Sequence, residues 1–271
     1  MNNGLDCLRG RMSERLITVA DMLGAGPYDA SKTLTMAKDN TVGKYNCTAD
    51  VGCDHGYISM YLVLRGISDR AIAMDLRQGP LSSAKGNVAE FGISDRVSLR
   101  LSDGLGELNK GEADSLVIAG MGGKLMISIL EKKDIPSLGI RTGVLQPQSD
   151  LSEFRTYLRE RGYEIVNEGM VFEDGKYYFP MLVDFQATGN VYDDAVKELS
   201  EVLPSPGAVR LADRYGVYNI LRRDPLLKTY LEHGHKVNSS IIGSLNKDQH
   251  PRRYEEVALK LRDIELLLDI F

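Results

Sequence analysis

The sequence has few cysteines and no long apolar run, and each absence excludes a class of protein. Its three cysteines, Cys7, Cys47 and Cys53, have neither the spacing of a disulfide framework nor that of a Cys-x-x-Cys metal motif. No apolar run reaches the 18 residues that a spanning helix needs, and Asp6 and Arg9 argue against a secretory signal. We therefore expect a cytoplasmic protein without a metal site or a membrane partner.

A large excess of charge of one sign is also missing, because the chain has 33 basic and 38 acidic residues and a net charge of −5. This balance argues against a wholly basic nucleic-acid coat, although a local basic patch is compatible with it. Hydrophobic residues make up 43% of the chain, as in ordinary globular proteins. For this length we expect one domain of roughly 180–200 residues and a smaller addition.

Short apolar strands alternate with helical segments through the first part of the sequence. An amphipathic helix is expected over 9–24, and a Gly/Pro/polar stretch follows over 24–46. Beyond it, alternation with short connections predicts βαβ units and a parallel sheet. The expected strands are 46–51, 71–75, 96–101, 115–120 and 142–147, and the expected helices are 57–66, 80–92, 124–133 and 151–162.

The alternation then stops. Two strand-like runs, 163–173 and 176–185, flank Asp174-Gly175, a typical hairpin turn, so we expect the sheet to end in an antiparallel pair. Only helical patterns follow, and we expect two of these helices to be long and antiparallel. The predicted domains are a cofactor-binding domain over 1–186 and a helical domain over 187–271.

Glycines and acidic residues follow the predicted strands at the edge where the carboxyl ends of parallel strands meet. Glycine lets a ligand approach the backbone closely as the chain turns into a helix. Asp75 ends the second strand, where a carboxylate can accept hydrogen bonds from both hydroxyls of a ribose. Asp103 follows the third strand, where a carboxylate can bind the amine of an adenine. The turn after the first strand contributes Asp50, Gly52, Cys53, Asp54 and His55.

These positions describe a cleft for a nucleoside cofactor, and two cofactors compete for it. A dinucleotide needs the Gly-x-Gly-x-x-Gly spacing, whereas three bulky residues separate Gly52 from Gly56 here. S-adenosylmethionine carries no phosphate and tolerates that spacing. At the exit of the fourth strand, three glycines within 120–123 open the backbone, and the amides of Gln146 and Gln148 after the fifth strand either hold a base or close a turn.

Six segments in this order resemble the bacterial tRNA (adenine-22-N1)-methyltransferase family. The resemblance covers roughly residues 11–24 and 46–185, and more weakly the helical tail. The segments are ADVGCDHGY (49–57), AMDLRQGPLSSAKGNV (73–88), VSLRLSDGL (97–105), VIAGMGGKLMISIL (117–130), LQPQ (145–148) and EDGKYY (173–178).

The resemblance implies an α/β fold, with a Rossmann-like seven-stranded methyltransferase sheet that has an antiparallel end and a helical, coiled-coil-like C-terminal domain. It implies S-adenosylmethionine as cofactor, tRNA as substrate and N1 of adenine 22 as the methylated atom. No residue is assigned as a catalytic acid or base, and the oligomeric state is not predicted. The implied cofactor-binding residues are Asp50, Gly52, Cys53, Asp54, His55, Asp75, Leu76, Asp103, Gly104, Gly120, Met121 and Gly122.

Three alternatives stay open at this point. The same fold and cofactor would serve a methyltransferase of a small molecule or protein, or a non-catalytic RNA-binding adaptor. The third alternative is an NAD-dependent oxidoreductase, which the glycine spacing disfavours. For stacking on a base we consider Tyr57, Tyr177 and Tyr178, and for contacts with tRNA phosphates Arg9, Arg11, Arg15, Lys124, Arg222, Arg223 and Lys228.

Overall fold

The structure is a computed structural model that describes residues 3–28, 44–203 and 207–271. It contains two compact units, Met1–Val191 and Tyr192–Phe271. Most of the predicted polar stretch over 24–46 lies outside the described residues. Within the described residues, no helix is both long and apolar enough to span a membrane.

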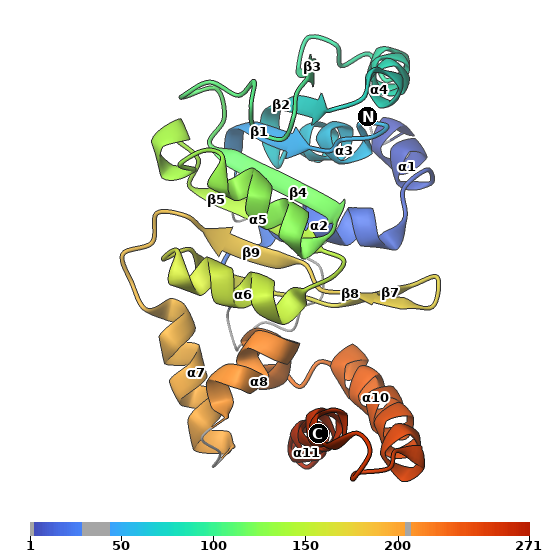
Figure 1. Cartoon of the computed structure of the whole chain (residues 1–271). Coiled ribbons are helices and arrows are strands. Elements are labelled where there is room, and N and C mark those ends of the chain that lie inside the picture. The colour runs from blue at the N-terminus through green and yellow to red at the C-terminus, as the bar shows by residue number, and fades with distance from the viewer. Residues whose placement is uncertain (1–2, 29–43, 204–206) are drawn as a thin grey trace. The chain divides into compact units, whose positions relative to one another are not determined.

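The first unit is built on a seven-stranded sheet in the order β3-β2-β1-β4-β5-β9-β6 (Figure 1). Its first five strands are parallel, and β9 pairs with both β5 and β6 in antiparallel fashion. The predicted seven-stranded sheet with an antiparallel end is therefore confirmed. The strands are β1 (Tyr45–Val51), β2 (Ser68–Asp75), β3 (Val97–Leu101), β4 (Ser115–Met121), β5 (Thr142–Pro147), β6 (Glu164–Glu168) and β9 (Met181–Asp184).

Helices cover the sheet because its central strands bury side chains on both faces. β4, for example, has four consecutive buried residues, Ser115–Ile118. Helices α2 and α3 pack together, and so do α5 and α6 on the other face (Figure 1). The helices are α1 (Asn3–Arg9), α2 (Glu14–Ala25), α3 (Tyr57–Arg65), α4 (Gln78–Glu90), α5 (Gly123–Glu131), α6 (Leu151–Glu160) and the 3-10 turn η1 (Pro136–Leu138).

Two local features of the sequence define the ends of these helices. The hydroxyl of Ser13 accepts a hydrogen bond from the Leu16 amide at 3.4 Å and caps α2. The prediction of one continuous helix over 9–24 is wrong, because a turn at Gly10–Met12 separates α1 from α2. Gly66 ends α3 in the left-handed conformation at φ +77°.

The antiparallel end of the sheet differs from the two long strands predicted over 163–173 and 176–185. Each run is broken in two, at Gly169 and before Pro180, which lacks the amide donor that a strand interior needs. The tips form a separate hairpin, β7 (Val171–Glu173) and β8 (Lys176–Tyr178), seen in Figure 1. Its turn, Asp174-Gly175, has positive φ at both residues, as a type I′ turn requires.

The second unit is helical, as predicted. Gly216 at φ +89° divides the helical run over 209–223 into two helices. The longest helices, α10 and α11, pack together across a short connection, and the Asp263 carboxylate is buried against Arg210 and Arg214. The helices are α7 (Val191–Val202), α8 (Ala208–Tyr215), α9 (Val217–Leu221), α10 (Pro225–Ser244) and α11 (Pro251–Leu268).

A buried ion pair joins α6 to the edge of the sheet. Arg155 Nε donates to Glu168 Oε1 at 2.7 Å, and neither side chain is exposed. The Arg155 guanidinium also lies over the Phe179 ring, 5.8 Å from its centroid. Because both charges are desolvated, removal of one leaves the other buried without its partner.

We expect Glu168→Ala to lower the free energy of unfolding by about 3–5 kcal/mol, because it removes the carboxylate that is paired with the buried Arg155 guanidinium. Urea denaturation of the full chain measures this loss. The matched control is Lys124→Ala, which removes the exposed pair with Glu153 and should change stability by about 1 kcal/mol at most. Equal effects of the two substitutions would contradict the structural role given to the buried pair.

Candidate functional site

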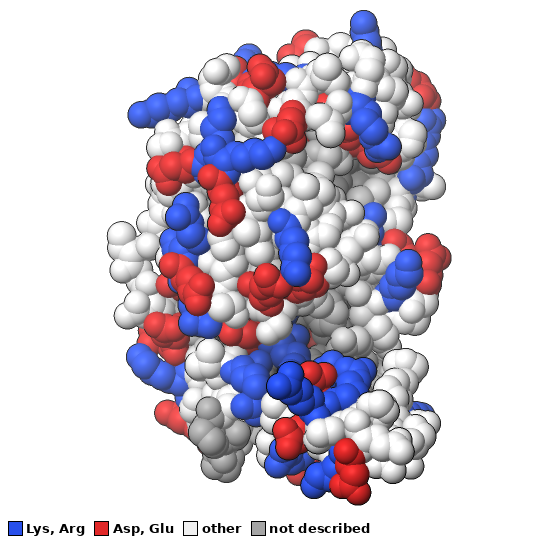
Figure 2. All heavy atoms as spheres, in the orientation of Figure 1, with Lys and Arg blue, Asp and Glu red and all other residues white. Residues whose placement is uncertain are grey.

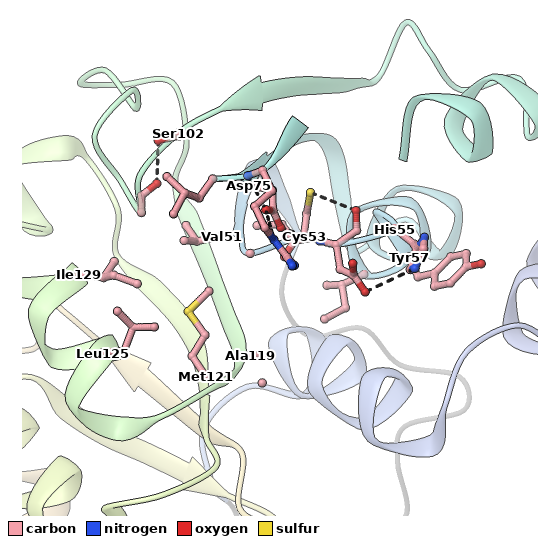
Figure 3. Close-up of a pocket in the computed structure, with 18 of the residues that line it drawn as sticks. Val51, Cys53, His55, Tyr57, Asp75, Ser102, Ala119, Met121, Leu125 and Ile129 are labelled. Carbon is pink, nitrogen blue, oxygen red and sulfur yellow. Dashed lines mark hydrogen bonds and ion pairs between the residues drawn. The ribbon is translucent and has the colours of Figure 1, made fainter. Parts of the chain in front are cut away.

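The carboxyl ends of the central parallel strands surround a cavity of about 430 Å³ (Figure 3). The β1–α3 turn, the ends of β2 and β3, and the exit of β4 contribute most of its walls. Of the twelve cofactor residues that the family resemblance implies, Gly122 alone does not line it. The lining residues are Arg15, Leu16, Asp50, Val51, Gly52, Cys53, Asp54, His55, Tyr57, Ile58, Asp75, Leu76, Arg77, Ser102, Asp103, Gly104, Ala119, Gly120, Met121, Leu125, Ile129 and Gln148.

The turn after β1 has the tight geometry that its glycines allow. Gly52 and Gly56 have φ of +76° and +75°, and the amides of Gly52 and Cys53 both donate to the Met74 carbonyl, at 2.8 and 2.9 Å. A Cβ atom on Gly52 would lie 2.2 Å from the Met121 methyl group. The floor of the cavity therefore has space for glycine alone, and the β1 turn packs directly against the exit of β4.

Asp50 is a buried carboxylate below this turn. Its Oδ2 accepts hydrogen bonds from the Ser59 hydroxyl at 2.6 Å and the Ser59 amide at 3.2 Å. In the part of the chain that the structure describes, no lysine or arginine forms an ion pair with it. Burial, reinforced by the negative charge of Asp75, raises the pKa of Asp50 to about 6, against the hydrogen bonds from Ser59.

Asp75 ends β2, where the sequence predicts it, and only 6% of its surface is exposed. Its carboxylate accepts from the amides of Arg77 at 2.9 Å and Asp54 at 3.3 Å, which fix its orientation. Arg77 Nε lies 3.8 Å away on a side chain that is 73% exposed. Leu76 is exposed beside it and presents an apolar surface to the cavity.

The other residues of the β1 turn differ in exposure. Cys53 is buried, and burial together with the charges of Asp50, Asp75 and Asp54 raises the pKa of its thiol, so it is neutral near pH 7 and no nucleophile. Asp54 lies 3.6 Å from His55, and both are largely exposed. His55 stacks on Tyr57 with ring centroids 5.8 Å apart.

The predicted adenine acceptor after β3 already has a partner. Asp103 is 65% exposed, and its Oδ2 accepts from Lys132 Nζ at 2.7 Å. Gly104 follows at φ +59°, and a Cβ atom there would lie 3.0 Å from the Ile129 side chain. The structure therefore gives this corner of the cavity a screened surface charge and an apolar contact with α5.

The exit of β4 supplies an apolar wall that the sequence did not predict. Figure 3 shows Met121, Leu125 and Ile129 grouped on the β4–α5 side of the cavity. Leu125 and Ile129 lie four residues apart on α5, so they share one face of the helix. Gly122 is the N-cap of α5 and faces Ser149, with 3.2 Å between the Ser149 hydroxyl oxygen and the position of a Cβ atom.

Opposite Gly120, the rim of the cavity carries Arg15, which α2 contributes. Its Nη1 donates to Gln146 Oε1 at 2.9 Å, and its guanidinium lies over the Tyr178 ring, 5.2 Å from the centroid. Glu173 Oε2 lies 3.9 Å from its Nε and balances its charge. Arg15 therefore ties α2 to β5 and to the β7–β8 hairpin at the mouth of the cavity.

The other basic residues proposed for tRNA in the first unit have structural partners. Arg9 donates to the Tyr61 hydroxyl, and Arg11 forms a bidentate pair with Glu90. Lys124 is exposed and lies near Glu153. Tyr177 packs against Phe172 on the hairpin, with ring centroids 4.6 Å apart. Of the three tyrosines considered for stacking, Tyr57 alone lines the cavity.

The charge of this cavity restricts its ligand. Four carboxylates line it, those of Asp50, Asp54, Asp75 and Asp103, against the guanidinium groups of Arg15 and Arg77. A cationic ligand would be attracted here, whereas the two phosphates of a dinucleotide would be repelled. Among the described residues, no group of three His, Cys, Asp or Glu side chains is placed to hold a metal ion.

Comparisons with known proteins agree with this geometry. A methyltransferase domain family model matches residues 31–181. The tRNA (adenine(22)-N(1))-methyltransferase of Bacillus subtilis (strain 168) is 30% identical over 262 residues, which cover 96% of this chain and 98% of that protein. The crystal structure of the B. subtilis m1A22 tRNA methyltransferase matches with a TM-score of 0.72 and 26% identity, over 95% of this chain and 98% of the other. A protein of the NADB-Rossmann superfamily from Streptococcus agalactiae matches with a TM-score of 0.73 and 25% identity, over 95% and 97%.

The raised pKa of Asp50 predicts a pH-dependent difference in stability between the wild type and Asp50→Asn. Because the folded-state value of about 6 exceeds the ordinary 3.8, the native state holds the proton more tightly. This contribution to stability is complete below about pH 4 and is lost as the pH rises through 6. From about pH 5 to pH 7 the wild type should lose about 1 kcal/mol relative to Asp50→Asn. Urea denaturation across this range measures it, and a constant difference would contradict it.

Proposed function

The chain belongs to the tRNA (adenine-22-N1)-methyltransferase family, and on that premise we propose that it transfers a methyl group from S-adenosylmethionine to N1 of adenine 22 in tRNA. The comparisons confirm the family that the sequence motifs indicated. The observation that best supports the proposal is the acidic cavity at the ends of β1 and β2, with Gly120 in its wall. In a protein of this activity the cytoplasm, where tRNA is found, is the expected location.

The residues present fit this cofactor. Its sulfonium and ammonium groups are cations, and Asp50 and Asp54 offer carboxylates on the same side of the cavity. Asp75 is oriented by two backbone amides and can accept hydrogen bonds from ribose hydroxyls. Gly52, whose Cβ position lies 2.2 Å from the Met121 methyl group, lets the β1 turn pack against the exit of β4 and complete the floor of the cavity. The full proposed set is Asp50, Gly52, Cys53, Asp54, His55, Asp75, Leu76, Asp103, Gly104, Gly120 and Met121, with Gly122 acting through the cap of α5.

When bound, the cofactor supplies an activated methyl group. The adenine N1 lone pair forms the new C–N bond while the C–S bond breaks and its electrons stay on sulfur, so positive charge moves from sulfur to the base. N1 carries no proton, and the site therefore needs no general base. The protein must align the two atoms and exclude water, a contribution of several kcal/mol. Met121, Leu125 and Ile129 provide the apolar wall for this task.

The substrate base must reach the cavity unpaired, because base pairing covers N1. We propose that the helical unit contributes RNA contacts through its basic side chains. In the view of Figure 2, Lys and Arg gather on that unit near α8 and the start of α10. This stretch contains Arg222, Arg223 and Lys228, and the last two are exposed. Arg210 and Arg214 are already bound to Asp263.

The proposed activity predicts N1-methyladenosine at position 22 of an unmodified tRNA transcript after incubation with the full chain and S-adenosylmethionine. Mass spectrometry of the nucleosides and of nuclease fragments detects and places it. A transcript with guanosine at position 22 is the matched control and should gain no methyl group. Transfer to small molecules or proteins, without transfer to tRNA, would overturn the proposal in favour of a different methyltransferase.

The proposed role of Asp75 predicts that Asp75→Ala lowers the affinity for S-adenosylmethionine by tenfold or more, since hydrogen bonds to a charged group contribute about 1.5–3 kcal/mol. Isothermal titration calorimetry measures the affinity. The control is Asp69→Ala on the same strand, which removes an exposed side chain paired with Lys44 and should bind as the wild type does. Unchanged affinity in folded Asp75→Ala would remove Asp75 from the proposed site.

A further inference from the structure

We infer, resting on the proposed function, that the side-chain amide of Gln148 selects adenine by binding its N6 and N7 edge. Gln148 directly follows β5, and its main-chain amide donates to the Met121 carbonyl at 2.8 Å. This bond fixes the residue beside the glycine opening. Its side chain is exposed and lines the cavity.

The Gln148 amide lies over the opening at Gly120. Gln148 Nε2 is 3.8 Å from the position that a Cβ atom on Gly120 would occupy, and Arg15 Nη1 is 3.6 Å from the same point. Gly120 has φ +81° and no side chain, and the amide and the guanidinium both lie at van der Waals distance from that Cβ position. The amide therefore lies at the rim, where it can meet the edge of a base bound in the cavity.

Gln146 and Gln148 are separated only by Pro147, but their side-chain amides differ in burial and in hydrogen bonding. Gln146 is fully buried, its Oε1 accepts from Arg15 Nη1 at 2.9 Å, and its Nε2 donates to the Pro147 carbonyl at 3.0 Å. Both ends of that amide are therefore engaged inside the protein. Among the described residues the Gln148 side chain makes no hydrogen bond, so its donor and acceptor are both available to a ligand.

The chemistry of the reaction decides which edge of the base this amide can bind. N1 must face the methyl donor, so the protein has to recognise adenine away from N1. On the opposite side of the amino group, adenine presents the N6 donor and the N7 acceptor, which glutamine matches with Oε1 and Nε2. Guanine presents two acceptors there, O6 and N7, so one would face Oε1 without a proton between them.

A neutral amide also suits the charge that the reaction creates. Positive charge builds on the ring as N1 gains the methyl group, which strengthens the N6–H donor. Oε1 of Gln148 accepts from that donor and stabilises the developing charge. The nearby Arg15 guanidinium is balanced by Glu173 and held by Gln146, so it does not oppose this charge at full strength.

A cycle of two enzymes and two substrates tests the inference. One tRNA carries adenosine at position 22 and the other carries 7-deazaadenosine, which replaces the N7 acceptor by C–H. Rates of methyl transfer from labelled S-adenosylmethionine at low tRNA concentration give kcat/KM. Gln148→Ala should be slower on adenosine, and its preference for adenosine over 7-deazaadenosine should be smaller than that of the wild type by about tenfold or more.

Equal discrimination by the wild type and Gln148→Ala would overturn the inference. Because 7-deazaadenosine changes the basicity of N1 in the same way for both enzymes, only the difference between them reports the contact. Gln186→Ala is the matched control: its amide donates to the Ile140 carbonyl at the other end of β5, and it should discriminate as the wild type does.

The affinity of Gln148→Ala for S-adenosylmethionine should equal that of the wild type, which separates a contact with the base from damage to the cofactor site. Failure of the wild type on the unmodified adenosine tRNA would instead overturn the proposed function. The two failures are therefore distinguishable.

Discussion

The site depends on one electrostatic constraint, the burial of two carboxylates at the carboxyl ends of β1 and β2 that no buried lysine or arginine among the described residues balances. Asp50 is held by a neutral serine, and Asp75 by two backbone amides and the exposed Arg77 guanidinium at 3.8 Å, so both carboxylates keep their orientation. Desolvation makes these charges costly for the protein, and the raised pKa of Asp50 reflects that cost. A cation bound beside the carboxylates would lower the cost, so the site favours a positively charged ligand.

Much of the cofactor side could be predicted from sequence because short connections leave the chain little freedom. Asp50, Gly52 and Asp75 immediately follow or end apolar strands, and the carboxyl ends of parallel strands meet at one edge. Strand identity was therefore enough to place them around one cavity. The same local logic fails where two signals compete. The spacing of apolar residues suggested one helix over 9–24, but Gly10 and the Ser13 cap divide it, and Pro180 divides a strand that looked continuous.

The substrate side could not be predicted in this way, because long-range packing builds it. Arg15 comes from α2 yet hydrogen-bonds to Gln146 on β5, and Glu173 reaches the same guanidinium from the hairpin. Nothing in the local sequence of any of the three indicates the other two. The apolar wall of Leu125 and Ile129 had a visible signal, the four-residue spacing on α5, but the pattern alone does not say whether that face covers the sheet or a cavity.

The cofactor end and the base end of the cavity differ in charge because the cofactor binds as a cation and the base binds as a neutral molecule. A cofactor that arrives charged is held by fixed charges, and its end of the cavity is acidic. The base arrives neutral and leaves with the positive charge, so strong fixed charges near it would favour one state over the other. Backbone glycine, an apolar wall and an uncharged amide leave both states accessible. Of the three glycines of 120–123, Gly120 lines the cavity, whereas Gly122 and Gly123 face Ser149. At Gly120 the neutral nucleophile, whose lone pair is already free, meets backbone, where other chemistries would require a side chain that moves a proton.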